Sequence, residues 1–422
     1  MRVLVTGGAG YIGSHVVRAL QRADHVPAIF DDLSTGHRVL AERTGADLVV
    51  GRVDDPGDLD RAFETHRPEA VVHVAGKALV GESVRDPGPY FRVNAVGGLA
   101  LLEAMRRHAV SRIVFSSTCA VYGVTRAEPI DEQCPREPVT PYGASKLAFE
   151  QMLAAYARAY GFRALALRYF NVAGAAPAGD LGEMHHPETH LVPNLLRAAA
   201  GEHAFCIYGA NYVTRDGTAE RDYLHVEDLA RAHVLALNRL DILDPLSFGG
   251  AVNLGTGRGT TVREMVTAVE DALGIELDVS VKPRRPGDPP SLVANPALAG
   301  RALGFKAQHD VASMIQSAQR FWLAERGRPE SPLRRRGLPT SASGRNGRPL
   351  RFGEAVVAAG YSDFATVERA LALQRERDGI GESHKLLGLI LLEMGELSSQ
   401  QLIELLRRMN HPSEAAAGAA QA

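Results

Sequence analysis

The sequence predicts a doubly wound α/β fold, in which helices cover both faces of a parallel sheet, together with a smaller domain. Three observations indicate it. A glycine-rich turn follows the first apolar run, an acidic residue ends the second, and further apolar runs alternate with helix-compatible stretches. The 422 residues are enough for a buried core and for more than one domain.

The first apolar run, residues 2–5, leads into TGGAGYIG at residues 6–13. Closely spaced glycines let the backbone turn sharply and approach a pyrophosphate, and the N–H groups of the following helix favour an anion. The second run ends at Asp31, about 20 residues further on, where a carboxylate would bind the ribose of a dinucleotide. No Arg or Lys adjoins Asp31, which favours NAD over NADP.

Four more apolar runs are candidate parallel strands, separated by helix-compatible stretches such as residues 97–109; they are residues 47–50, 70–75, 112–116 and 164–168. Residues 252–255 predict a strand that returns to the sheet. Ligands of such sheets bind at the carboxyl ends of the strands, so the chemistry is expected there.

Polar residues that fit proton transfer follow the run at 112–116. Thr118 lies at its end, and Tyr142 and Lys146 are spaced i and i+4 on a predicted helix, so they share one face. An ammonium beside the phenol, helped by an oxidised nicotinamide, would favour the phenolate, and Tyr142 would then act as a base. Tyr-x-x-x-Lys also occurs on solvated helix faces, but here it follows a dinucleotide fingerprint.

These motifs together resemble the extended short-chain dehydrogenase/reductase superfamily. Within it, the chain is similar to the UDP-glucose 4-epimerases in VGESV at 80–84, RYFNVAGA at 168–175, residues 185–193, and DGTAERDYLHVEDL at 216–229. The resemblance covers about residues 1–325. It implies a C4 epimerase of UDP-glucose and UDP-galactose, which works through a 4-keto sugar and tightly bound NAD.

The resemblance also implies roles for single residues. Catalytic roles fall to Thr118, Tyr142 and Lys146. Implied cofactor contacts are Gly7, Gly10, Tyr11, Ile12, Gly13, Asp31, Asn94, Lys146 and Tyr169. Implied substrate contacts are Thr118, Tyr142, Asn171, Arg221, Arg285 (with Arg284 as the alternative), Asp288 and Leu292.

One departure from the family concerns adenine. The family usually carries Gly-Asp-Ile or Gly-Asp-Val after the third strand, and its Asp contacts adenine. Here Arg52 stands at the position of that Asp, between Gly51 and Val53. Asp54 or a backbone group would then have to make the contact.

Related activities are separated by a few positions. Sugar-nucleotide 4,6-dehydratases carry Asp-Glu, and the related decarboxylases also a Glu, where this chain has Cys119 and Ala120, which can be neither acid nor base. Leu292 is intermediate in size at a position that, by resemblance, governs N-acetylated sugars, so UDP-N-acetylhexosamines and UDP-pentoses stay open as substrates. A non-catalytic nucleotide-sugar sensor is disfavoured because Thr118, Tyr142 and Lys146 are all present.

Other partners receive little support. A net charge of −2 does not indicate nucleic acid or a membrane surface. His185, His186 and His190 suggest a metal, but no Cys or carboxylate spacing completes a tetrahedral site, so no metal is expected. Three cysteines without paired spacing, and no leader or long apolar run, predict a cytoplasmic protein without membrane insertion. A homodimer through the epimerase unit stays open.

Composition divides the chain into domains. Residues 1–326 are the predicted epimerase unit, with a Rossmann core at about 1–170 and substrate lid segments at about 171–215 and 255–310. Residues 327–349 are rich in Arg, Pro, Ser and Gly and predict a flexible basic linker. Apolar periodicity returns at 350–410, and residues 411–422 form an Ala-rich tail expected to be disordered.

The segment 350–410 contains a repeat of 35 residues, as in Gly353 and Gly388. Each copy predicts two short helices with a Gly C-cap between them, and residues 398–401 match a capping box. The first copy resembles the N-terminal domain of type II secretion and pilus-assembly ATPases, some of which bind cyclic di-GMP. Arg351 and Gln374 match its ligand contacts, whereas the second copy has apolar residues there. A module that docks a protein partner is therefore favoured over a cyclic di-GMP site.

Overall fold

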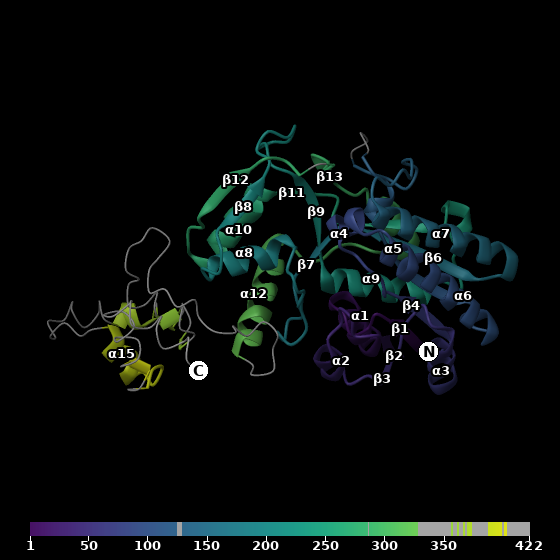
Figure 1. Ribbon diagram of the computed structural model, residues 1–422, viewed down its shortest axis with the longest axis horizontal. Coiled ribbons are helices and arrows are strands. Elements are labelled where there is room, and N and C mark those ends of the chain that lie inside the picture. Colours follow the sequence, from purple (N-terminus) through teal and green to yellow (C-terminus); the bar gives the residue numbers. More distant parts are fainter. Residues whose placement is uncertain are drawn as a thin grey trace. The chain divides into compact units, whose positions relative to one another are not determined.

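The structure is a computed structural model, traced in sequence order in Figure 1. It divides the chain into two compact units, residues 1–333 and 334–422. The residues that it describes are 1–124, 129–285, 287–327, 356–357, 361–362, 366–367, 369–373, 387–398 and 401–402. No helix among them is long and apolar enough to cross a lipid bilayer.

A parallel sheet of seven strands forms the centre of the first unit, in the order β10-β6-β5-β4-β1-β2-β3. The strands are β1 (Arg2–Thr6), β2 (Val26–Asp31), β3 (Leu48–Val50), β4 (Ala70–His73), β5 (Arg112–Thr118), β6 (Arg163–Tyr169) and β10 (Ala251–Leu254). Every predicted strand is present, and the doubly wound α/β fold is confirmed. The strand order reverses between β1 and β4, which is where ligands bind in such sheets.

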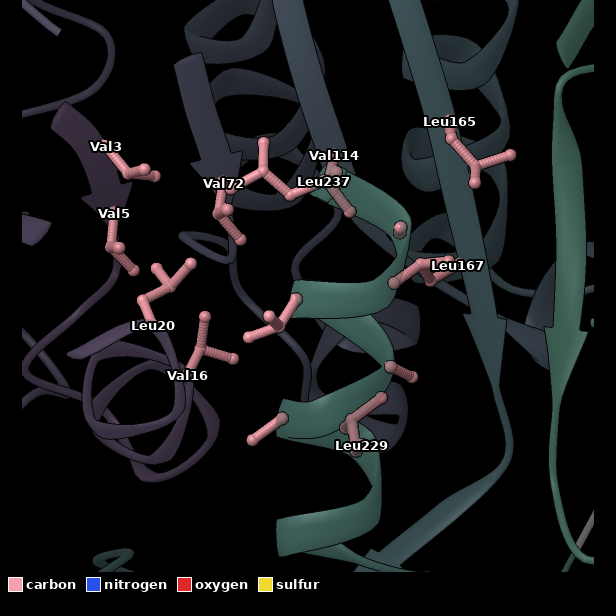
Figure 2. Close-up of a cluster of buried hydrophobic side chains, with 14 of the residues drawn as sticks. Val3, Val5, Val16, Leu20, Val72, Val114, Leu165, Leu167, Leu229 and Leu237 are labelled. Atoms are coloured by element: carbon pink, nitrogen blue, oxygen red, sulfur yellow. The ribbon is translucent and has the colours of Figure 1, made fainter. Parts of the chain in front are cut away.

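Helices cover both faces because side chains alternate along the central strands. Val3 and Val5 enter one core and Leu4 enters the other. The first core is drawn in Figure 2, in which Val16 and Leu20 of one helix and Leu229 and Leu237 of another lie against the strands. Its helices are α1 (Tyr11–Arg22), α9 (Val226–Arg239) and α11 (Ala297–Leu303), and the other face carries α3 (Pro56–His66), α6 (Gly97–Arg107) and α7 (Pro141–Tyr160).

A smaller domain holds a third core, which contains Leu195, Ile207, Met265 and Ile315. It is built from strands β8 (Phe205–Tyr208) and β12 (Val279–Lys282) with helices α8 (Leu191–Ala199), α10 (Val262–Leu273) and α12 (Val311–Gly327). Most of it comes from the predicted lid segments. However, α12 adds to this core, and α11 packs on the large sheet instead.

A small sheet is centred on β9 (Glu220–His225), which pairs with β11 (Gly259–Thr261), β13 (Ser291–Leu292) and β7 (Asn171–Ala173). Shorter elements complete the first unit. They are α2 (Arg38–Thr44), α4 (Val80–Arg85), α5 (Gly88–Tyr90), the π-helix η1 (Phe91–Val96), and the 3₁₀ turns η2 (Cys119–Val121) and η3 (Pro245–Phe248).

The second unit shows the 35-residue repeat in its backbone. The N–H of Tyr361 donates to the carbonyl of Val356 (3.2 Å), and 35 residues later the N–H of Glu396 donates to that of Leu391 (2.9 Å). Val356 and Leu391 are buried in one apolar cluster, so the two copies share a core. Helix α15 (Leu387–Glu393) belongs to the second copy.

The predicted signals between the helices of the second copy are confirmed. Gly395 has a φ of +74°, the left-handed conformation of a C-cap glycine. The capping box follows: the hydroxyl of Ser398 accepts from the N–H of Gln401 (3.2 Å), whose side-chain oxygen accepts from the N–H of Ser398 (2.8 Å). Arg351 and Gln374 lie outside the described residues.

Candidate active site

The glycine loop between β1 and α1 is shaped by close backbone contacts. Gly7 has a φ of +73°, and a Cβ atom there would lie 2.6 Å from the amide nitrogen of Ala75. A Cβ atom on Gly13 would lie 2.0 Å from the carbonyl oxygen of Gly7. Gly10 precedes α1 and places no side chain over the first N–H groups of the helix. The loop is therefore a cradle with free helix N–H groups, which fits a pyrophosphate.

Asp31, the last residue of β2, lies beside this cradle. One of its carboxylate oxygens accepts from the N–H of Ala9 (3.0 Å) and the other from the N–H of Leu33 (2.9 Å). Burial raises the pKa of Asp31, and these two bonds lower it. A carboxylate offers about four acceptor positions, so two are left for ribose hydroxyls. The structure thus brings together the glycine loop and the acidic residue that the sequence pairs.

The departure at Arg52 has a structural consequence. Its guanidinium forms two parallel hydrogen bonds with the carboxylate of Asp54, at 3.0 and 2.8 Å. Asp54, one of the two predicted substitutes for the missing adenine contact, is therefore held by Arg52. A backbone group remains as the other predicted contact.

Thr118 and Tyr142 meet at the carboxyl end of β5. Thr118 ends this strand, and Tyr142 lies in the first turn of α7. Burial raises the pKa of Tyr142 to about 12, and a hydrogen bond with Thr118 acts to lower it. The phenol is therefore already paired with the hydroxyl that is predicted to bridge base and substrate.

The start of α7 is held close to β5 by features of its own sequence. The hydroxyl of Thr140 caps the helix by accepting from the N–H of Gly143 (3.2 Å). A Cβ atom on Gly143 would lie 2.4 Å from the carbonyl oxygen of Ala120, so only glycine permits this approach. Sequence reasoning passed over Gly143, although its place directly after the predicted base was a usable signal.

Lys146 is buried one turn further along α7. Its ammonium donates to the carbonyl of Ser116 (3.0 Å), and its nitrogen lies 4.8 Å from the centre of the Phe115 ring. Burial lowers the pKa of Lys146 to about 8, while Glu150 acts to raise it. Burial raises the pKa of Tyr142, and Thr118 and Cys119 also act on it; that Lys146 and an oxidised nicotinamide together favour the phenolate stays a prediction.

Glu150 is a buried partner that sequence reasoning missed, although it continues the i, i+4 spacing from Tyr142 and Lys146. It receives a hydrogen bond from the hydroxyl of Ser117 (2.5 Å) and forms an ion pair with Arg168 (2.6 Å). Because Ser117 precedes Thr118 in β5 and Arg168 lies in β6, this network ties both strands to α7.

Two predicted cofactor residues lie close to this group. The amide of Asn94 bonds both backbone groups of Lys77 (2.9 and 3.0 Å) and the hydroxyl of Ser145 (2.9 Å), so it positions the chain after β4. Tyr169 lies opposite Thr118 in the strand register. Direct contact of either residue with a cofactor stays a prediction.

The predicted substrate residues gather around β9. Arg221 donates to the carboxylate of Asp288 and to the carbonyl of Pro289 (2.9 Å). Leu292 faces Arg221 across the β13–β9 pair, and Asn171 faces Tyr223 across the β7–β9 pair. Burial raises the pKa of Cys119, the neighbour of Thr118, and Arg221 acts to lower it, so this group lies near Thr118.

The two alternative arginines differ in their neighbours. The Arg284 guanidinium lies 4.1 Å from the centre of the Tyr212 ring, whereas that of Arg285 lies 4.2 Å from the centre of the Tyr208 ring. Burial and then Asp288 raise the pKa of Tyr212, which places Tyr212 beside the substrate residues. Its hydroxyl is buried without a hydrogen-bond partner among the described residues. Tyr212 is therefore a further candidate contact, and Arg284 shares its cluster.

A second acid and base are lacking at the positions where dehydratases carry them. Burial raises the pKa of Cys119 to about 12, so its thiol does not exchange protons near neutral pH. Ala120 has no ionisable group.

No metal was expected because no Cys or carboxylate spacing completed a site with the histidines. The structure shows that two carboxylates do lie beside them. Glu183 and Glu188 lie with His185 and His190, and one ligand atom from each falls within 4.8 Å of all the others. The sequence argument missed this because the two carboxylates and two imidazoles belong to an irregular segment, whose periodicity does not indicate which side chains converge.

A family model describes the first unit. The NAD dependent epimerase/dehydratase family matches residues 3–255. The chain belongs to this family. The predicted class, an NAD-dependent isomerase that epimerises UDP-sugars at C4, is thereby confirmed, as is NAD as the cofactor.

The relatives are similar to this chain over almost their whole length. The UDP-glucose 4-epimerase of Lacticaseibacillus casei is 43% identical over 332 residues, which cover 78% of this chain and 98% of the relative. A solved UDP-glucose 4-epimerase from Brucella ovis in complex with NAD is 47% identical with a TM-score of 0.71, covering 75% of this chain and 97% of that one. One from Bifidobacterium longum, with NAD⁺ and UDP, is 35% identical with a TM-score of 0.72, covering 77% and 98%.

Proposed function

We propose that this epimerase interconverts UDP-glucose and UDP-galactose, with Thr118, Tyr142 and Lys146 as its catalytic residues. The observation that carries the proposal is the contact of Thr118 with Tyr142 at the end of β5, two residues after Ser116, whose carbonyl Lys146 holds. The glycine cradle and Asp31 form a site that fits NAD. Arg221 and its partner Asp288, called the Arg221 group below, form a site that fits the diphosphate and uridine.

The proposed mechanism assigns the proton to Tyr142. Its phenolate oxygen takes the proton of the sugar 4-hydroxyl, and Thr118 orients both oxygens. Bound NAD supplies a hydride acceptor at this stage and a hydride donor afterwards. The 4-keto sugar then turns about its link to UDP while the Arg221 group keeps the nucleotide in place. Tyr142 finally returns the proton, and the configuration at C4 is inverted.

A coupled assay of UDP-galactose turnover tests the proposal. We expect the purified chain to form UDP-glucose without added NAD, because each turnover regenerates the cofactor. A folded, NAD-containing protein that converts neither sugar would favour the nucleotide-sugar sensor instead.

Leu292 is proposed to set the substrate range from its place opposite Arg221. It packs against the apolar cluster that contains Val121 and Phe170. Leu292→Tyr adds bulk, which would meet an acetamido group before a hydroxyl. We therefore expect kcat/KM for UDP-N-acetylglucosamine to fall about tenfold more than for UDP-galactose, which corresponds to about 1.4 kcal/mol.

The control for this prediction is Leu292→Met, which conserves side-chain volume and is expected to leave kcat/KM for both substrates unchanged. Steady-state kinetics with both sugars and with a UDP-pentose measure the preference. Equal losses for all three substrates in Leu292→Tyr would contradict a role in selection.

We propose that the second unit folds independently and is dispensable for epimerisation. Every catalytic and substrate residue precedes it. The end of α12 must be kept, because Glu325 bonds Arg43 (2.7 Å) and Arg326 bonds Glu202 (2.8 Å). Removal of residues 328–422 is expected to leave kcat unchanged within about twofold. A large loss in a truncated protein that still folds would show that the second unit supports the site.

For the second unit, docking of a protein partner remains the favoured role and cyclic di-GMP the alternative. Calorimetric titration of the full chain with cyclic di-GMP distinguishes them. Heat that disappears in Arg351→Ala would favour the nucleotide, and no heat at millimolar ligand would rule it out.

The oligomeric state and location are proposals as well. Val96 and Leu99 are exposed apolar residues near the start of α6, and we propose that they form a homodimer contact. Light scattering of Leu99→Glu, expected to be monomeric, tests this. Cys119, Cys134 and Cys206 are free thiols, which supports the reducing cytoplasm as the location.

A further inference from the structure

The segment that leads from β7 into α8 brings two carboxylates and two imidazoles together. The Nδ1 atoms of His185 (2.8 Å) and His190 both contact the same oxygen of Glu183. The Nδ1 atom of His190 also lies 3.7 Å from an oxygen of Glu188. Glu183 and Glu188 are almost fully buried, with exposed side-chain fractions of 6% and 4%.

We propose that Glu183, His185, Glu188 and His190 bind a Zn²⁺ ion. Two imidazoles with two carboxylates form a donor set that suits Zn²⁺ better than the harder Mg²⁺ or Ca²⁺. Zn²⁺ with ligands at about 2.0–2.1 Å requires donor atoms about 3.3 Å apart. The four donor atoms lie within 4.8 Å of one another; His185 lies 2.8 Å from Glu183, and His190 lies 3.7 Å from Glu188.

Charge supports the same assignment. Two buried carboxylates place two negative charges in a small volume; burial lowers the pKa of His190, but Glu183 and Glu188 raise it to about 9, so without a metal the His190 imidazolium balances one of these charges. Such a pair is costly unless cations balance it. One divalent ion balances both charges while the histidines remain neutral, which is the form that binds metals.

The ligands are held by surrounding backbone groups, as metal ligands usually are. The same oxygen of Glu188 that faces His190 accepts from the N–H groups of Thr189 and His190, both at 2.8 Å. His185 and His190 keep exposed side-chain fractions of 31% and 45%, so an ion can reach the site from solvent.

The bound ion would hold residues 183–190 in a fixed conformation beside the glycine cradle. The carbonyl of Met184, between two of the ligands, accepts from Nε2 of His37 (2.6 Å), and the N–H of His37 donates to the carbonyl of Ala9 (2.8 Å). The predicted consequence is structural, because all four positions of a tetrahedral ion are filled by protein groups.

The test uses the full chain without a histidine tag, stripped with a chelator and re-equilibrated with Zn²⁺. Metal analysis is expected to find about one Zn²⁺ per chain, and Co²⁺ should give the visible absorption of a four-coordinate site. Glu183→Gln and His185→Gln should weaken Zn²⁺ binding by about tenfold or more in a titration against a competing chelator.

His186→Gln is the matched control, because His186 is an exposed neighbour outside the cluster. It should bind Zn²⁺ as the wild type does, and Zn²⁺ should raise the melting temperature of both proteins but not that of Glu183→Gln. Equal loss of binding in His186→Gln, or no stoichiometric Zn²⁺ in the wild type, would overturn the proposal. His185→Gln, at a half-buried position, carries the test if Glu183→Gln does not fold.

Discussion

Replacing Tyr142 with Phe is expected to lower kcat by about 10²- to 10⁴-fold and to leave bound NAD in place, because only the group that transfers the proton is removed. The phenol is buried and bonds Thr118, which keeps its second bond to the N–H of Ala120 (3.1 Å). Steady-state kinetics with UDP-galactose measure the loss, and absorbance after denaturation measures the NAD content.

Tyr160→Phe is the matched control for this experiment. Tyr160 ends the same helix, and 54% of the residue is exposed, far from the predicted site chemistry. Its loss of a hydroxyl should change neither kcat nor NAD content. If Tyr142→Phe turned over at the wild-type rate, another group would have to be the base.

Lys146→Met is expected to lower kcat by about 10²-fold or more, since it removes a buried positive charge and the bond that holds the carbonyl of Ser116, two residues before Thr118. Lys306→Met, the same change at an exposed position, should have no effect. The rate measurements are made at saturating UDP-galactose, and NAD content is determined in each protein.

The same substitution has a pH-dependent effect on stability. Burial lowers the pKa of Lys146 to about 8, whereas an unfolded lysine titrates near about 10.4. Between these values the unfolded chain holds a proton that the folded chain has lost, so this group adds stability as the pH rises through the window. Below pH about 8 both states are charged, and the burial cost remains in full.

We therefore compare the melting temperatures of the wild type and Lys146→Met as the pH is raised from about 7.5 to 9.5. Over this range the difference between them is expected to shift in favour of the wild type, by the equivalent of about 1–3 kcal/mol. The comparison of two proteins removes the contribution of the other titrating groups. A difference that stays constant over this range would mean that Lys146 is not charged and buried as the structure has it.

The proposed catalytic residues could be found in the sequence because their signals are local. Tyr142 and Lys146 lie on one helix face by their spacing, and the glycines of residues 6–13 and Asp31 adjoin strands whose apolar runs are unambiguous. Each of these requires only the geometry of one helix or one strand end. The repeat in the second unit could be found for the same reason, because matching residues recur in the sequence at a spacing of 35.

Contacts between distant segments could not be predicted in this way. The hydrogen bonds of Arg52 with Asp54, the bond of Lys146 to the carbonyl of Ser116, and the ion pair of Glu150 with Arg168 were not among the predictions. Each depends on which side chains a fold brings within a few ångströms, and spacing along the chain does not record that.

The sequence by itself determined the fold class, the glycine turn after the first strand and the helix face that carries Tyr142 and Lys146, because parallel strands, tight glycine turns and helical spacing follow from local backbone sterics. Only the tertiary structure decided that Arg221 bonds Asp288, that Tyr212 holds an unpaired buried hydroxyl, and that Glu183 and Glu188 converge with two histidines. Those residues belong to loops and short strands without a regular period. Their positions are set by the packing of the smaller domain, where the buried groups must find partners once water is excluded.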